Sequence, residues 1–128
     1  MRLARELPIR LLTHNIRYAT NETFKGEEAW AVRAPRMISE LEFHTMYVQE
    51  SFICMQEVLH NQLVDIVAGL NGMGKFASAI GGASPAPLSR STAANTWSYI
   101  GVGREDGKEE GEYSPILYKP AVWRLNTQ

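Results

Sequence analysis

The segment of this 128-residue chain that indicates its fold most clearly is Ser51-Phe52-Ile53-Cys54-Met55-Gln56-Glu57-Val58. It is a short, nearly continuous apolar run that ends in polar residues, which is typical of a β-strand covered on both faces. Glu57 therefore stands at the carboxyl end of a buried strand, where open α/β sheets place their ligands. A carboxylate there is a hard oxygen ligand suited to magnesium. Taken alone, a strand-end glutamate facing solvent is the simpler interpretation.

Upstream of this stretch, the chain predicts one more strand and one helix. Residues 9–16 follow Pro8 and form an apolar, β-compatible run. Residues 17–26 are polar and predict a loop, whereas residues 27–44 have helical spacing. Pro35 lies inside that helical stretch, so we expect the helix to begin close to it. The polar residues expected to face water on this helix are Arg33, Arg36, Glu40 and Glu42.

Downstream, helical spacing over 60–70 predicts a second helix, which Asn71 and Gly72 close. Residues 97–104 and 113–119 predict two strands joined by a polar turn. Residues 120–125 are expected to start one more strand. Strand, helix, strand, helix and hairpin in this order predict a layered α/β fold.

One segment interrupts this order. Residues 75–95 are rich in Ala, Ser, Gly and Pro and show no lasting periodicity. They predict a flexible loop or insertion. The length of 128 residues suits a single domain over 1–128 that contains this insertion.

Asn15 ends the first predicted strand in the same way that Glu57 ends the second. A right-handed crossover would make these two strands neighbours and bring both side chains to one edge of the sheet. The Asn15 amide could then hold a metal-bound water or a phosphate oxygen. A turn-forming asparagine is the simpler interpretation of Asn15 by itself, and the pairing with Glu57 favours the functional one.

The predicted hairpin carries further candidates. Arg104 could clamp a phosphate through two hydrogen bonds, and Glu112 could orient a histidine that acts as general acid or base. Tyr113 follows directly. The competing interpretation is a charged hairpin that simply faces water.

Composition restricts the setting of the protein. The formal net charge of −1 gives no overall positive field that would draw the chain to nucleic acid or an anionic membrane. A bound divalent cation could still attract a phosphate locally. Cys54 is the single cysteine, so an intrachain disulfide is impossible and an intracellular, cytoplasmic location is expected. We find no signal peptide and no transmembrane stretch in the sequence.

Four blocks of sequence resemble the endonuclease/exonuclease/phosphatase family in order and spacing. They are Thr13-His14-Asn15-Ile16-Arg17-Tyr18, Trp30-Ala31-Val32-Arg33, the run from Phe52 to Val58, and the run from Ile100 to Tyr118. The resemblance implies the amino-terminal half of a DNase I-like fold, a four-layered α/β sandwich. It also implies attack of water on a phosphate ester that depends on Mg²⁺, with Mn²⁺ as a possible substitute.

The resemblance also implies roles for single residues. Glu57 would be a metal ligand, and Asn15 would contact the metal, its water or the phosphate as part of the catalytic site. Glu112 would match the glutamate that supports the active-site histidine. Arg104 and Tyr113 would contact the substrate. That substrate would be nucleic acid, a phosphoinositide or another phosphate ester, because the family includes nucleases, phosphodiesterases and phosphatases.

The chain departs from the family pattern in its insertion at 75–95, where the family usually passes directly from helix to strand, and more seriously in two missing motifs. It lacks the Asp-x-Asn and Ser-Asp-His motifs of the second half of the family, and its histidines are His14, His44 and His60. We therefore expect this chain to be incomplete, to be inactive alone, and to leave an apolar sheet face uncovered. The alternative hypothesis is a non-catalytic half-domain that acts as a binding module or pairs with a separate chain.

Overall fold

The structure is a computed structural model, and it describes residues 6–72 and 95–126. The part of the chain that it describes contains two helices and four strands. In chain order they are β1 (Arg10–Asn15), α1 (Trp30–Thr45), β2 (Ser51–Gln56), α2 (His60–Leu70), β3 (Ser98–Ile100) and β4 (Ile116–Tyr118). The α/β class predicted from the sequence is confirmed.

The strands form one sheet in the order β1-β2-β4-β3. β1 and β2 are parallel, since α1 carries the chain back to the edge from which β1 starts, and Asn15 is aligned with Gln56. β4 runs antiparallel to β2, and β3 runs antiparallel to β4. The predicted pairing of the first two strands across a helical crossover is therefore correct, and both strands end at the same edge.

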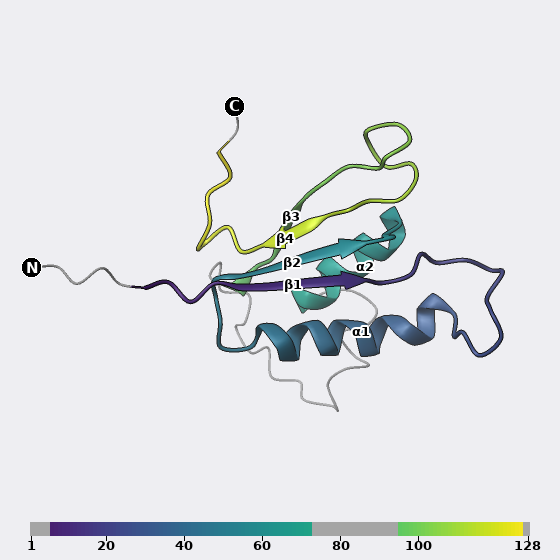
Figure 1. Cartoon of the computed structure of the whole chain (residues 1–128), viewed down its shortest axis with the longest axis horizontal. Helices are drawn as coiled ribbons and strands as arrows, with labels where there is room; N and C mark the ends of the chain where they lie inside the picture. Colours follow the sequence, from purple (N-terminus) through teal and green to yellow (C-terminus); the bar gives the residue numbers. More distant parts are fainter. Residues whose placement is uncertain (1–5, 73–94, 127–128) are drawn as a thin grey trace, which may run out of the picture.

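Both helices contribute to a single core on one face of the sheet (Figure 1). The inward side chains of β2 alternate with half-exposed ones, as expected for a strand covered on one face. This differs from the prediction of a strand covered on both faces. The fully buried side chains at the centre of the core are Ile38 and Leu41 from α1, Ile53 and Met55 from β2, Leu63 and Ile66 from α2, and Leu117 from β4.

The opposite face of the sheet is open in the described part of the chain. Leu11 of β1 is 68% exposed, and its neighbour Phe52 is half-buried. The Trp123 ring covers part of Phe52, with 4.9 Å between the ring centroids. The open face thus carries the apolar side chains of Leu11 and Phe52 beside the polar side chains of Thr13 and Gln56.

The first helix begins earlier than the sequence predicts. α1 starts at Trp30, so Pro35 lies at its sixth residue and leaves one helical carbonyl without its usual N–H partner. Tertiary contacts hold the early turn, because the Trp30 ring is buried and its Nε1 donates to Asp65 of α2 at 2.8 Å. One further expectation for α1 is wrong, because Arg33 is directed into the protein.

The carboxyl-terminal strands are shorter than predicted. The hairpin pairs over only three residues in each strand. The predicted additional strand at 120–125 is absent, and the N–H groups of Val122 and Trp123 both donate to the Lys119 carbonyl in a turn. The predicted insertion at 75–95 lies outside the described residues except for Asn95. Neither described helix has the length and apolar character needed to cross a membrane.

Candidate functional site

The candidate site lies where β1 and β2 end. Asn15 is the last residue of β1, and Glu57 directly follows β2. Asn15 Nδ2 donates to Glu57 Oε1 at 2.8 Å, although the two residues lie 42 positions apart in the chain. The expectation that the crossover brings these side chains to one edge of the sheet is confirmed.

The orientation of the Asn15 amide follows from its second contact. Its Oδ1 accepts a hydrogen bond from the Arg17 N–H at 3.0 Å, so its nitrogen is the atom that faces Glu57. Because the amide oxygen is already used by the backbone, this geometry makes Asn15 a donor to the Glu57 carboxylate. No hydrogen bond from any residue that the structure describes reaches the other carboxylate oxygen, Oε2. A direct contact of Asn15 with metal or phosphate stays a prediction.

An open hollow of about 440 Å³ lies beside this pair. Three charged residues that the sequence did not single out as site residues, Arg17, Glu27 and Arg33, line it. Arg17 and Glu27 form an ion pair with 3.1 Å between Nε and Oε1. The Phe24 N–H and the Arg17 guanidinium lower the pKa of Glu27, and Glu27 raises the pKa of Arg17. The position of Arg17, two residues after Asn15 in the same motif, was the available signal. The lining residues are Asn15, Arg17, Phe24, Glu27, Arg33 and Glu57.

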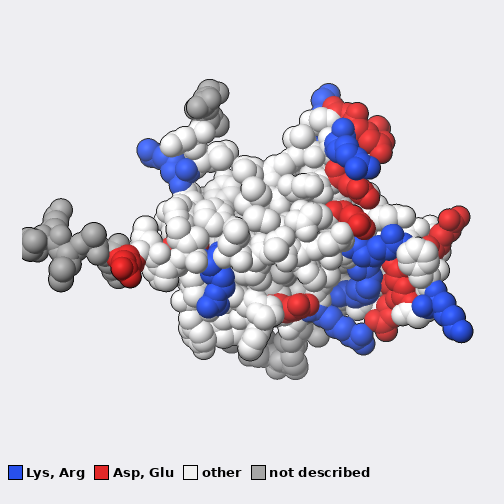
Figure 2. Space-filling view, in the orientation of Figure 1, with Lys and Arg blue, Asp and Glu red and all other residues white. Residues whose placement is uncertain are grey.

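Charged side chains gather at this end of the molecule. Figure 2 shows blue and red atoms at the end toward which β1 and β2 point, whereas most of the central surface in the same view is uncharged. The hollow is lined by two positively charged residues, Arg17 and Arg33, and by two negatively charged residues, Glu27 and Glu57. An anionic ligand approaching this edge would therefore meet both guanidinium groups and carboxylates.

The hairpin candidates lie in the loop between β3 and β4. Arg104 and Glu112 form an ion pair with 3.5 Å between Nη1 and Oε2. In the described part of the chain, neither residue has a hydrogen bond or ion pair with Asn15 or Glu57. Their predicted roles toward a histidine and a phosphate stay predictions.

Tyr113 connects the hairpin loop to the end of β2. Its backbone pairs with that of Val58, next to Glu57, in an isolated bridge. The side chain is buried, and its hydroxyl donates to the Lys108 carbonyl at 2.7 Å and lies 3.0 Å from His60 Nδ1. Burial raises the pKa of this phenol. The visible contribution of Tyr113 is to hold the loop, and its predicted contact with substrate is untested.

The donor atoms at the sheet edge fit a magnesium ion that keeps several of its water ligands. Among the described residues, no group of three or more histidine, cysteine and acidic side chains is arranged to hold a metal. Mg²⁺ does not need such a cage, because it commonly keeps several waters and binds one or two carboxylates together with substrate phosphate. Glu57 could supply one such carboxylate, oriented by Asn15.

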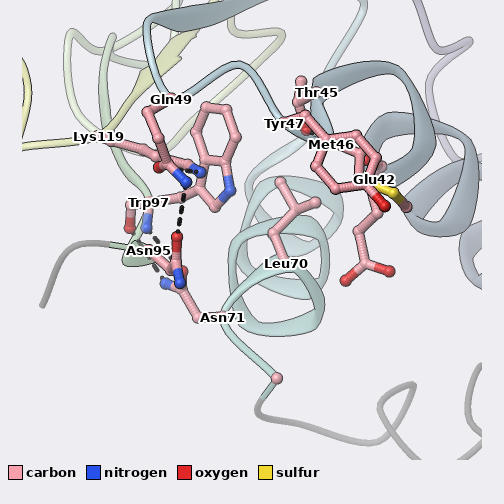
Figure 3. Close-up of a pocket in the computed structure, with 11 residues that line it drawn as sticks. Glu42, Thr45, Met46, Tyr47, Gln49, Leu70, Asn71, Asn95, Trp97 and Lys119 are labelled. Carbon is pink, nitrogen blue, oxygen red and sulfur yellow. Dashed lines mark hydrogen bonds between the residues drawn. The ribbon is translucent and has the colours of Figure 1, made fainter. Parts of the chain in front are cut away.

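A second hollow, of about 380 Å³, lies at the opposite end of the sheet (Figure 3). None of the residues predicted from the sequence as site residues lines it. Lys119 is only 6% exposed there, and its Nζ donates to Gln49 Oε1 at 2.9 Å and lies 5.0 Å from the centre of the Trp97 ring. Burial lowers the pKa of this amine.

Replacing Lys119 with Met should stabilise the protein by about 1 kcal/mol at pH 7, because the variant no longer buries a charge. The lowered pKa makes the unfolded chain bind more protons, so the stability contributed by Lys119 rises with pH. The gap between variant and wild type should therefore narrow as the pH approaches ~10.4, the usual pKa of lysine. Urea unfolding at pH 7 and pH 10 measures both effects. A variant less stable than wild type at pH 7 would contradict the prediction.

Comparison with known proteins gives the relatives of this fold. No protein-family model and no curated protein sequence matches the chain. Solved structures do match. An endonuclease/exonuclease/phosphatase from Bacteroides vulgatus is 32% identical, with a TM-score of 0.58, over 86% of this chain and 31% of its own. A mannosyl-6-phosphatase from Bacteroides thetaiotaomicron is 25% identical, with a TM-score of 0.60, over 88% of this chain and 32% of its own.

A third structure, an endonuclease/exonuclease/phosphatase family protein from Bacteroides thetaiotaomicron, is 26% identical with a TM-score of 0.58. It matches over 85% of this chain and 30% of its own. The chain thus spans about a third of the length of these structures. The sheet layer and the helical layer described above correspond to part of their DNase I-like α/β fold.

Proposed function

We propose that this chain supplies one side of a phosphate-ester hydrolase site. It has the fold of the endonuclease/exonuclease/phosphatase family and matches part of the length of the solved structures in that family. The proposed reaction is attack of water on a phosphate ester in the presence of Mg²⁺, with Mn²⁺ as a substitute. Members named among the similar structures include a phosphatase that acts on a mannosyl phosphate, and we extend phosphate-ester hydrolysis to this chain as a class. Nucleic acids, phosphoinositides and sugar phosphates are all within that class.

The observation that carries the proposal is the pair of Asn15 and Glu57 at the carboxyl edge of two parallel strands. That edge is where open α/β sheets bind their ligands. The 2.8 Å hydrogen bond uses one carboxylate oxygen of Glu57 and leaves the other to face a ligand. A carboxylate held in this way by a neighbour binds a hard cation with less loss of side-chain freedom.

The chain's own residues would divide the work as follows. Glu57 would bind the cation, and Asn15 would orient the Glu57 carboxylate. When bound, Mg²⁺ would neutralise charge that develops on a phosphoryl oxygen. Arg17, whose guanidinium is tied to Glu27, would present positive charge toward a phosphate at the mouth of the hollow. Arg104, Glu112 and Tyr113 remain proposed contributors from the hairpin loop.

The alternative, a non-catalytic half-domain, has less support. The open sheet face is compatible with it, but the comparisons do not support a complementing chain. A binding module would also have no need to align a carboxylate and an amide at the ligand-binding edge of the sheet.

Removal of metal tests the proposed function. The full-length protein, meaning the protein in which this chain meets the other side of the proposed site, should lose hydrolysis of phosphate esters when it is stripped with EDTA. It should regain hydrolysis with Mg²⁺ or Mn²⁺. The panel should contain bis-p-nitrophenyl phosphate, p-nitrophenyl phosphate, mannose 6-phosphate, a phosphoinositide and a DNA duplex. Hydrolysis that survives exhaustive chelation would contradict the metal requirement. No hydrolysis of any of these esters with either metal would overturn the proposed function.

A further inference from the structure

The two segments that form the site share an unusual backbone conformation. Arg17, just after β1, has φ of 59°, and Glu57, just after β2, has φ of 56°. Both angles lie in the left-handed region, which costs a non-glycine residue roughly 1–2 kcal/mol. Such a conformation persists only where surrounding contacts impose it. The contacts that impose it on the first segment come from both helices.

Arg33 of α1 is the first of these contacts. Its Nη1 donates to the Ile16 carbonyl at 2.7 Å, and its Nη2 donates to the Arg17 carbonyl at 3.1 Å. Its Nε donates to the Glu28 carbonyl at 3.0 Å. The planar fork of the guanidinium thus donates hydrogen bonds to two successive carbonyls of the turn after β1, a geometry that a lysine ammonium does not reproduce.

Gln62 of α2 is the second contact. It is a polar side chain with 0% exposure, and both ends of its amide are used. Its Oε1 accepts from the Leu59 N–H at 3.0 Å, at the start of α2, and its Nε2 donates to the Arg17 carbonyl at 3.0 Å. One side chain therefore joins the beginning of α2 to the turn after β1.

These contacts lead step by step to Glu57. Arg33 and Gln62 fix the Arg17 carbonyl, and the Arg17 N–H on the same residue donates to Asn15 Oδ1. Asn15 Nδ2 then donates to Glu57 Oε1. Every link is a hydrogen bond between 2.8 and 3.1 Å.

We propose that Arg33 and Gln62 are positioning residues that hold the Glu57 carboxylate in its ligand-binding orientation, acting through the Arg17 backbone and the Asn15 amide. The inference rests on the proposed function for the identity of the ligand, Mg²⁺. It goes beyond that function because it assigns the orientation of Glu57 to two side chains on helices, whose own hydrogen bonds go to residues other than Glu57. Outer partners of this kind typically change metal affinity by about 10- to 100-fold.

Two conservative variants test the proposal. Arg33→Lys keeps the positive charge and removes the fork, whereas Gln62→Glu keeps an acceptor for the Leu59 N–H and removes the donor to Arg17. Leu63→Val is the matched control, because Leu63 is fully buried in the core of the same helix and has no place in the hydrogen-bonded chain. Urea unfolding identifies how much each variant is destabilised, so that a general loss of stability is recognised.

Two readouts on the full-length protein separate the possible failures. In metal-free protein, the ¹⁵N–¹H signals of the Asn15 side-chain amide, assigned by their loss in Asn15→Asp, should move in Arg33→Lys and Gln62→Glu and not in Leu63→Val. In calorimetric titration, the Kd for Mg²⁺ should rise about 10-fold or more in the first two variants and stay within about twofold in the control.

The results divide in a simple way. If the Asn15 signals stay in place in both helix variants, or move equally in Leu63→Val, the positioning roles of Arg33 and Gln62 are overturned. If wild-type protein binds no Mg²⁺ and hydrolyses no ester, the proposed function fails, while the amide spectra still decide whether the two side chains position Asn15.

Discussion

Replacing Glu57 with Gln is expected to lower kcat/KM of the full-length protein for phosphate esters by about 1,000-fold, which corresponds to ~4 kcal/mol of transition-state stabilisation. A neutral amide oxygen is a much weaker ligand for Mg²⁺ than a carboxylate. The substitution preserves the side-chain volume and an oxygen that can still accept the hydrogen bond from Asn15 Nδ2. The fold should therefore survive, and urea unfolding should give the stability of wild type within about 0.5 kcal/mol.

The matched control for this experiment is Glu50→Gln. Glu50 directly precedes β2, so it lies at the other end of the same strand, away from the site. Glu50→Gln makes the same chemical change as Glu57→Gln and should leave the rate of Mg²⁺-dependent hydrolysis unchanged. Hydrolysis by Glu57→Gln at the wild-type rate would contradict the assignment of Glu57 as a metal ligand. An equal loss in both variants would mean that the activity depends on general charge.

Replacing Gly69 with Val is expected to destabilise the protein by about 2–3 kcal/mol. Gly69 is buried in α2 where this helix meets α1. A Cβ at this position would lie 2.5 Å from Ile38 Cδ1 and 3.1 Å from Ile38 Cγ2. These distances are below ordinary van der Waals contact, so the helices must separate or Ile38 must leave its place in the core. Urea unfolding of the purified protein measures the loss.

A double-mutant cycle identifies the cause. Gly69→Ala adds only the Cβ, and Ile38→Val removes the Cδ1 atom that this Cβ would meet. In the Ile38→Val background, Gly69→Ala should cost less than in wild type, with a coupling energy of about 1 kcal/mol. Ala also has a helix propensity about 1 kcal/mol better than Gly, which should become visible once the clash is relieved. Strictly additive effects would show that the closeness of the two helices does not depend on this contact.

The elements of the fold followed from local signals in the sequence. The apolar run ending at Glu57 and the run before Asn15 correctly predicted two strands, and the helical spacing over 60–70 matches α2 residue for residue. A chiral crossover between parallel strands then left little choice about which strands are neighbours. This is why the contact between Asn15 and Glu57 could be anticipated from residues 42 positions apart.

The boundaries that failed were set by contacts distant in sequence. Pro35 suggested a helix start, but the bond from Trp30 to Asp65 and the burial of Trp30 support an earlier one. The hairpin was predicted as two strands over 97–104 and 113–119 joined by a polar turn, and this pattern does not show where the loop at 103–112 folds back on itself. There the backbone bonds from Gly103 to Lys108 and from Glu105 to Glu110 replace strand pairing.

The α/β class, the pairing of the first two strands and the meeting of Asn15 and Glu57 could be predicted from the residues alone. They depend on periodicity, turn residues and crossover handedness, which are local or chiral properties. Which atom of Asn15 faces Glu57, and which residues hold that atom there, became clear only from the folded arrangement. Arg33 has the sequence position of a solvent-facing helical residue, yet its guanidinium donates hydrogen bonds to two carbonyls of the turn after β1. Gln62 is a polar residue on an apolar helix face, and its partner is 45 positions away. Hydrogen bonds between such distant residues depend on how the helices pack on the sheet, and no local pattern records that packing.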